Sequence, residues 1–184
     1  MTAAATALPR AILSTDADIK RFLLGGNATI TVLNTETGER RTIKVSCKRD
    51  KVDDGWAIKS PFFVNVMTGS CNEEHFTYTG LVPSNAAKTG DKFYAYSPKR
   101  GGARSEKAGQ GSTAFKWLWS LIHGRNSNGS ARTPSDNHVA AYSNLEIWHE
   151  GRCGCCGRKL TVPESIDRGI GPVCWDRLGA MGAR

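Results

Sequence analysis

The chain has 184 residues, of which 39% are hydrophobic, and it carries a formal net charge of +8 with a pI of about 9.4. This length suits one compact domain with a small appendage, and no apolar run approaches the roughly 20 residues of a membrane-spanning helix. The start, MTAAATALPRAIL, has no basic region ahead of an apolar core, so a secretory signal is not indicated and we expect a cytoplasmic protein with no membrane partner.

The first elements are an arm and a short helix. Residues 1–13 are rich in Ala and Thr, and we expect a flexible arm there. Ser14 or Thr15 can cap a helix over 16–24, whose apolar residues fall on one face and which Gly25 ends.

The hydrophobic period then changes to two, which is typical of strands. Five strand-like runs follow in series with turn residues between them, at 27–34, 40–47, 62–67, 76–82 and 92–97. The segment 48–56 is charged and is expected to be a connection. The class is therefore predicted as α+β, with an antiparallel β meander or small barrel and a few helices.

Residues 97–113 contain four glycines and no branched aliphatic residue, which predicts a loop. A basic loop of this kind can follow a phosphate backbone, or it can be a solvated linker. On the first interpretation the candidate nucleic-acid contacts are Lys99, Arg100, Arg104 and Lys107.

The segment 113–123 has apolar residues at helical spacing, which favours a core-packing helix over a surface on which bases stack. The segment 124–137 is polar, and 140–148 is expected to be a strand. We therefore divide the chain into the arm, a β-rich domain over 14–145 and a C-terminal module over 146–184. The basic excess is concentrated late: residues 1–96 have 12 basic and 10 acidic side chains, and residues 97–184 have 13 and 7.

Four of the six cysteines lie in the stretch HEGRCGCCGRKLTVPESIDRGIGPVCW, from His149 to Trp175. Cys153 and Cys156 have the C-x-x-C spacing of a zinc knuckle, and Cys174 follows at the start of an expected helix over 174–180. In a reducing compartment such clusters indicate metal or redox chemistry before disulfides. The glycines around the motif argue against a redox C-x-x-C, which opens a helix. A structural Zn²⁺ is therefore predicted.

The fourth zinc ligand is either His149 or Cys155. We favour His149, because neighbouring side chains in a tight turn diverge and Cys155 is adjacent to a ligand. Cys47 and Cys71 are distant in sequence and are expected to be core thiols. The module also carries the candidate nucleic-acid contacts Arg152, Arg158, Lys159 and Arg168.

The segment from His149 to Cys174 resembles a small zinc module of phage and plasmid proteins and of some repair and helicase-like proteins. The shared pattern is C-x-x-C-G-R-x-L, then P-E-S, then G-I-G-P-x-C, over about 26 of the 184 residues. That family usually has a basic or polar residue where Cys155 stands, so the resemblance implies that Cys155 is not a ligand. The preceding strands resemble, more loosely, the β-rich region found beside this module in mobile-element proteins.

The composition is also compatible with the small DNA-reading subunit of plasmid-borne type IV CRISPR effectors, which would recognise a protospacer-adjacent motif within a ribonucleoprotein. No residue is carried over from that comparison. We expect a non-catalytic protein that binds nucleic acid together with other subunits, with DNA as the favoured ligand and RNA as the alternative. The alternative is a mobile-element effector that binds a host defence protein. An enzyme is disfavoured, because no catalytic motif accompanies the isolated His75 and His123.

Overall fold

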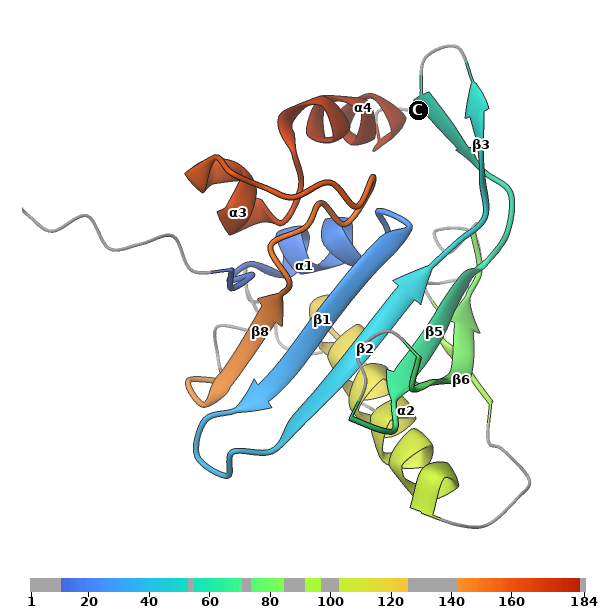
Figure 1. Ribbon diagram of the computed structural model, residues 1–184, viewed down its shortest axis with the longest axis vertical. Helices are drawn as coiled ribbons and strands as arrows, with labels where there is room; N and C mark the ends of the chain where they lie inside the picture. The colour runs from blue at the N-terminus through green and yellow to red at the C-terminus, as the bar shows by residue number, and fades with distance from the viewer. Residues whose placement is uncertain are drawn as a thin grey trace, which may run out of the picture.

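The computed structural model describes residues 11–52, 55–70, 74–84, 92–96, 103–125 and 142–182. Within these ranges the chain forms a six-stranded antiparallel sheet, a separate hairpin and four helices (Figure 1). The expected α+β class is confirmed. In chain order the elements are α1 (Asp16–Leu23), β1 (Asn27–Asn34), β2 (Arg40–Ser46), β3 (Arg49–Val52), β4 (Gly55–Ile58), β5 (Phe62–Met67), β6 (Phe76–Val82), β7 (Tyr94–Ala95), α2 (Ala103–Ile122), β8 (Leu145–His149), α3 (Pro163–Arg168) and α4 (Pro172–Gly182).

The sheet is open, with strand order β7-β6-β5-β2-β1-β8. Strands β1, β2, β5, β6 and β7 are sheet neighbours in the expected meander order, and the late strand β8 pairs antiparallel with β1 on its other side. The segment expected to be a charged connection instead forms the β3–β4 hairpin. Each strand of this hairpin is only four residues long. Such a short segment does not show the alternation of apolar and polar residues from which a strand is predicted.

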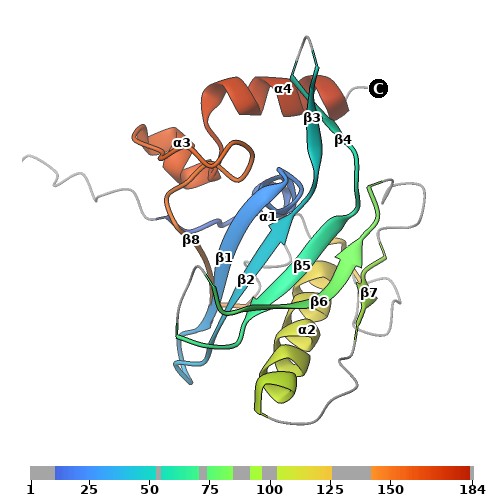
Figure 2. The ribbon, with the colours of Figure 1, turned by 45° about the vertical axis from the view of Figure 1, so that its right-hand side comes forward.

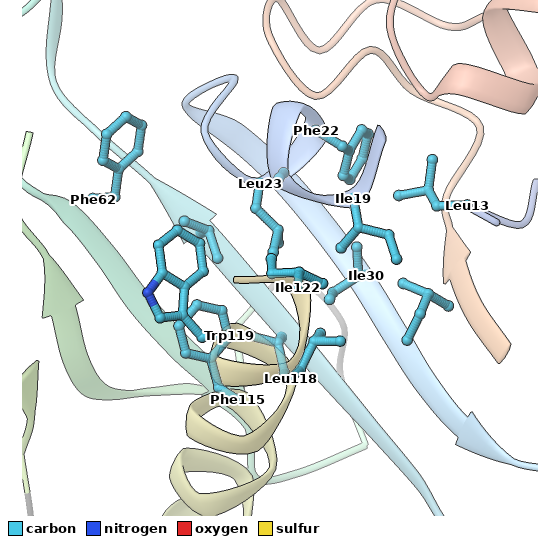
Figure 3. Close-up of a cluster of buried hydrophobic side chains, with 14 of the residues drawn as sticks. Leu13, Ile19, Phe22, Leu23, Ile30, Phe62, Phe115, Leu118, Trp119 and Ile122 are labelled. Carbon is cyan, nitrogen blue, oxygen red and sulfur yellow. The ribbon is translucent and has the colours of Figure 1, made fainter. Parts of the chain in front are cut away.

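One face of the sheet carries the core. The alternate residues Ile43, Val45, Val64 and Val66 are fully buried there, as the period of two requires. Helices α1 and α2 cover this face, and none of the helices in the described ranges lies on the other one (Figures 1 and 2). The two helices contribute apolar residues to the same core as Ile30 (Figure 3), among them Ile19, Phe22, Leu23, Phe115, Leu118, Trp119 and Ile122.

Helix α2 begins ten residues before the expected helix, so the prediction of a loop over 97–113 is wrong for 103–113. Gly109 and Gly111 led to the prediction of a loop, and Gly111 also explains how α2 packs on the sheet. A Cβ at Gly111 would overlap the side chain of Val66 on β5, whereas a Cβ at Gly109 would meet nothing. The small residue at 111 lets the helix lie close against the sheet. Lys99 and Arg100 are outside the described residues.

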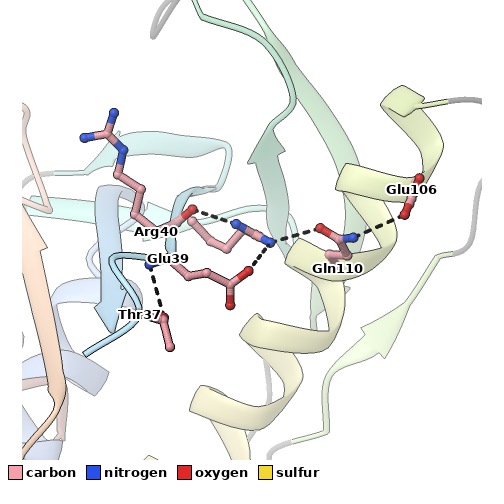
Figure 4. Close-up of polar contacts among 6 residues, drawn as sticks. Thr37, Glu39, Arg40, Glu106 and Gln110 are labelled. Carbon is pink, nitrogen blue, oxygen red and sulfur yellow. Dashed lines mark hydrogen bonds and ion pairs between the residues drawn. The ribbon is translucent and has the colours of Figure 1, made fainter. Parts of the chain in front are cut away.

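A polar chain fixes the first turns of α2 to β2 (Figure 4). Arg41 donates to Glu39 at 3.3 Å and to the side-chain oxygen of Gln110 at 2.9 Å. The amide of Gln110 in turn donates to Glu106, one helical turn earlier. These contacts hold the first turns of α2 beside the start of β2.

The residues just before α1 are held to β8. The amide of Leu13 donates to the carbonyl of Ile147 at 2.8 Å, and that of His149 donates to Ala11 at 2.8 Å. Leu13 is 1% exposed. Residues 11–13 therefore do not belong to a flexible arm; the rest of the expected arm, residues 1–10, lies outside the described residues. No helix in the described part of the chain is long and apolar enough to cross a membrane.

Candidate metal centre and its basic surroundings

The C-terminal segment leaves β8, turns sharply through the cysteines and continues into two helices. The amide of Cys153 donates to the carbonyl of Arg158 and that of Gly157 donates to the carbonyl of Cys153, which closes the turn. Gly157 has a φ of +76°, a conformation that favours glycine. Helix α3, which was not predicted, starts with Pro163 and ends at the left-handed Gly169. Helix α4 starts two residues before Cys174, close to the expected position.

This path brings together three of the predicted ligands. The sulfur atoms of Cys153, Cys156 and Cys174 all lie within 4.8 Å of one another. Cys153 and Cys174 are buried, while Cys156 is exposed. Three converging thiols form a soft donor set that suits Zn²⁺. A metal at this position would tie the cysteine turn to the first turn of α4.

Backbone amides favour the ionised form of the Cys153 thiol. Burial opposes charge on Cys153, but hydrogen bonds from the amides of Cys156, Gly171 and Cys155 outweigh it and lower its pKa. The Gly171 amide lies 3.4 Å from the sulfur. Burial and the neighbouring thiols raise the pKa of Cys174. A bound cation would reverse that repulsion, because it stabilises every thiolate that ligates it.

His149 does not join the cluster, contrary to the prediction. Its Nε2 atom lies 2.7 Å from the carbonyl oxygen of Ile166, and its Nδ1 atom accepts from the amide of Gly151 at 3.1 Å. The side chain is buried on the core face of β8, with its ring 5.3 Å from that of Phe22. Both ring nitrogens thus contact the backbone, and His149 links β8 to α3 and to the cysteine turn.

Cys155 is turned toward the β3–β4 hairpin. Arg49 donates to the carbonyl of Cys155 at 2.6 Å, to its sulfur at 3.5 Å and to the carbonyl of Gly25 at 2.9 Å. Burial raises the pKa of the Cys155 thiol, which also shares a hydrogen bond with that of Cys174. Cys47 is half-buried beside the core, as expected for a core thiol, and Cys71 lies outside the described residues. Sequence reasoning missed Arg49, which no motif distinguishes from its charged neighbours.

A cavity of about 560 Å³ opens directly beside the three thiols. Arg158, Lys159 and Arg177 contribute to its wall, and all three are exposed. Among the described residues that line it, none is a carboxylate or a histidine. The described wall of the cavity therefore combines three cationic side chains with the three thiols.

The remaining predicted contacts are dispersed. Arg152 donates to the carbonyl of Gly157 across the cysteine turn, at 3.2 Å. Arg168 stacks on the ring of Trp175, with Arg21 of α1 at 3.9 Å from the same ring. Lys107 lies far from the module, where it lines a cavity of about 230 Å³ with Arg40 and Arg41. The backbone of Arg104 belongs to α2.

A protein-family model described as a family of unknown function, DUF6011, matches residues 147–179. The match extends from β8 through the cysteine turn and α3 into α4, and so contains all three clustered cysteines. No curated protein and no solved structure matches the chain.

Proposed function

We propose that the chain is a non-catalytic nucleic-acid-binding protein whose C-terminal module is organised by one Zn²⁺ ion. The observation that carries the proposal is the cavity beside Cys153, Cys156 and Cys174, whose wall includes three exposed cations. The metal would fix the backbone on which these cations are mounted, and the cations would supply the attraction for phosphate.

The thiols account for the metal. Thiolate donors select soft or borderline ions, and Zn²⁺ with cysteine ligands is the usual structural centre of small modules. Three thiols converge in the structure, while His149 contacts the backbone of Ile166 and Cys155 contacts both Arg49 and the Cys174 thiol. The described wall of the cavity has no carboxylate or histidine, which supports a structural and binding role over a hydrolytic one.

The cations account for nucleic acid. Arg158 and Lys159 directly follow the cysteine turn, and Arg177 projects from α4 into the same cavity wall. Arginine can contact either phosphate or the edge of guanine with two hydrogen bonds, whereas lysine on phosphate attracts all sequences alike. DNA is the expected ligand of this surface, and membership of a larger ribonucleoprotein stays a prediction.

The test is fluorescence anisotropy with short DNA duplexes at two salt concentrations. We expect the Arg158→Ala/Lys159→Ala variant to bind at least about tenfold more weakly, with a salt slope smaller by roughly 0.9 for each lost phosphate contact. Lys48→Ala/Lys116→Ala removes two exposed charges elsewhere and serves as the matched control. Equal affinity for the wild type and both variants, at full zinc content, would contradict the proposal and favour a protein-binding effector.

A further inference from the structure

The sheet face opposite α1 and α2 has the composition of a binding surface. Residues paired across neighbouring strands share a face, and the register aligns Lys44 with Asn65 and Asn65 with Tyr78. It likewise aligns Phe63 with Leu81 and Leu81 with Tyr94. The face thus presents aromatic side chains from β5, β6 and β7, and no helix of the described ranges covers it (Figures 1 and 2).

These aromatic rings form a row that runs across the strands. The ring of Phe63 lies 6.3 Å from that of Tyr78, and Tyr78 lies 5.6 Å from Tyr96. Tyr94 and Tyr96 are 50% and 54% exposed. Tyr94 and Tyr96 thus leave about half of their surface exposed on a face that no helix of the described ranges covers, and exposed aromatic patches mark interaction sites.

Cations accompany the rings. Lys44 holds its ammonium group 5.8 Å from the ring of Phe76, in the middle of the face. Arg40 stands four residues earlier on β2, so it points to the same side by alternation. It also lines the small cavity with Arg41 and Lys107 at the end of the strand. The rings therefore lie beside positively charged side chains. This combination suits nucleic acid, whose phosphates are negative and whose bases are flat.

We infer that this open sheet face is a stacking platform for single-stranded nucleic acid. The inference rests on the proposed function and adds to it a second surface and a substrate class. Unpaired bases expose π faces that stack on Phe and Tyr with little regard to sequence, and antiparallel sheets with exposed aromatics bind two or three bases in this manner. The strand would cross β5, β6 and β7 along the ring row, with its phosphates near Lys44 and Arg40. Duplex bases are already stacked and cannot use the platform.

The experiment measures anisotropy with a fluorescein-labelled 12-nucleotide single strand, as DNA and as RNA, and with the matching duplex. Leucine keeps the apolar bulk of these side chains but removes the rings, so the test variant is Tyr78→Leu/Tyr96→Leu. Stacking contributes about 1–3 kcal/mol per base, so we expect this variant to lose at least about tenfold in affinity for the single strand and little for the duplex. Tyr142→Leu, whose ring contacts Trp117 of α2, is the matched control and should bind as the wild type does.

The outcomes separate the two proposals. Wild-type single-strand affinity in Tyr78→Leu/Tyr96→Leu overturns the platform, whatever Arg158→Ala/Lys159→Ala does to duplex binding. Single-strand loss in the tyrosine variant, with duplex binding unaffected by the Arg158 and Lys159 changes, supports the platform and contradicts the module surface. A concentration-dependent dimer that the tyrosine variant abolishes, without oligonucleotide binding, would assign the face to a second copy and overturn the inference.

Discussion

The three clustered thiols have different electrostatic surroundings. Cys153 receives backbone amides that stabilise its thiolate, whereas burial and its thiol neighbours keep Cys174 protonated in the absence of a cation. A bound zinc ion would stabilise the thiolates of both Cys153 and Cys174, because its positive charge offsets their mutual repulsion.

We expect Cys153→Ser, Cys156→Ser and Cys174→Ser each to lose bound zinc, and Cys155→Ser to retain it. The first three remove a sulfur from the converging set, whereas Cys155 is held by Arg49 outside that set. Elemental analysis of the purified proteins, at one zinc per wild-type chain, measures this. Full zinc in Cys174→Ser, or none in Cys155→Ser, would refute the ligand assignment.

His149 gives the fold a dependence on pH. Burial outweighs the hydrogen bond to Ile166 and the nearby Glu150 and Asp167, and lowers the pKa of its imidazole. The neutral ring is therefore favoured in the folded state. Its contribution to stability is complete above the unfolded pKa of about 6.5 and is lost as the pH falls below that value toward the folded pKa.

The His149→Gln variant isolates this contribution, since all other groups titrate in both proteins. At pH 7.5 we expect the variant to be less stable than the wild type by roughly 1–3 kcal/mol, because two part-buried backbone groups, of Gly151 and Ile166, lose their partner. The difference should shrink at pH 5.5. Urea unfolding at both pH values measures it, and a constant difference would show that His149 does not titrate with folding.

At the scale of elements, close backbone approach decides how the helices and the hairpin are placed. Gly111 brings α2 against Val66, and a Cβ at Gly25 would meet the backbone of Gly154 in the cysteine turn at 2.6 Å. Arg49 bridges the same two segments from β3. The hairpin, the end of α1 and the cysteine turn are thereby joined at one point.

Two alanine substitutions in α2 test the approach of this helix to the sheet. Gly111→Ala should destabilise the protein by about 1–3 kcal/mol, because the added methyl overlaps Val66. Gly109→Ala, on the open side of the same helix, should stabilise it by about 0.5–1 kcal/mol through helix propensity. Thermal unfolding by circular dichroism compares them. Effects of the same sign would show that α2 does not pack on β5 through Gly111.

Arg49 offers a second test at this scale. Arg49→Gln should lower the free energy of unfolding by roughly 1.5–3 kcal/mol, as expected when a charged group loses hydrogen bonds to two carbonyls. The exposed neighbour Lys48, changed to Gln, should leave stability within about 0.5 kcal/mol of the wild type. Guanidinium titrations provide both values. Equal stability of the two variants would show that the hydrogen bonds of Arg49 do not stabilise the fold.

Across the whole molecule the cysteine cluster and the sheet share one core. Cys153, Leu160, Ile170 and Cys174 belong to the same buried cluster as the residues under α2. The strand that leads into the cysteine turn is itself an edge of the sheet. Binding of the proposed metal would therefore couple to the stability of the sheet as well as to that of the module.

We expect a chelator to lower the melting temperature of the entire protein in a single transition. The continuous core leaves no boundary at which the module can unfold while the sheet stays intact. Calorimetry with and without chelator measures this, and the Cys155→Ser protein, which should retain zinc, is the control. Two separate transitions after chelation would show that the module unfolds independently.

The sequence by itself determined the elements whose signal is local. These local signals are the period of two in ATITV and TIKVS, the cap at Thr15 and the spacing of Cys153, Cys156 and Cys174. The structure contains the strands, the helix and the thiol cluster that they predict.

Tertiary structure decided the features that depend on residues distant in the sequence. Helix α2 extends through Gly109 and Gly111 because packing against Val66 outweighs the weak helix propensity of glycine. His149 contacts Ile166 and lies outside the thiol cluster because pairing with β1 turns it into the core. The aromatic row exists because the register aligns three strands, and no single strand carries that pattern alone.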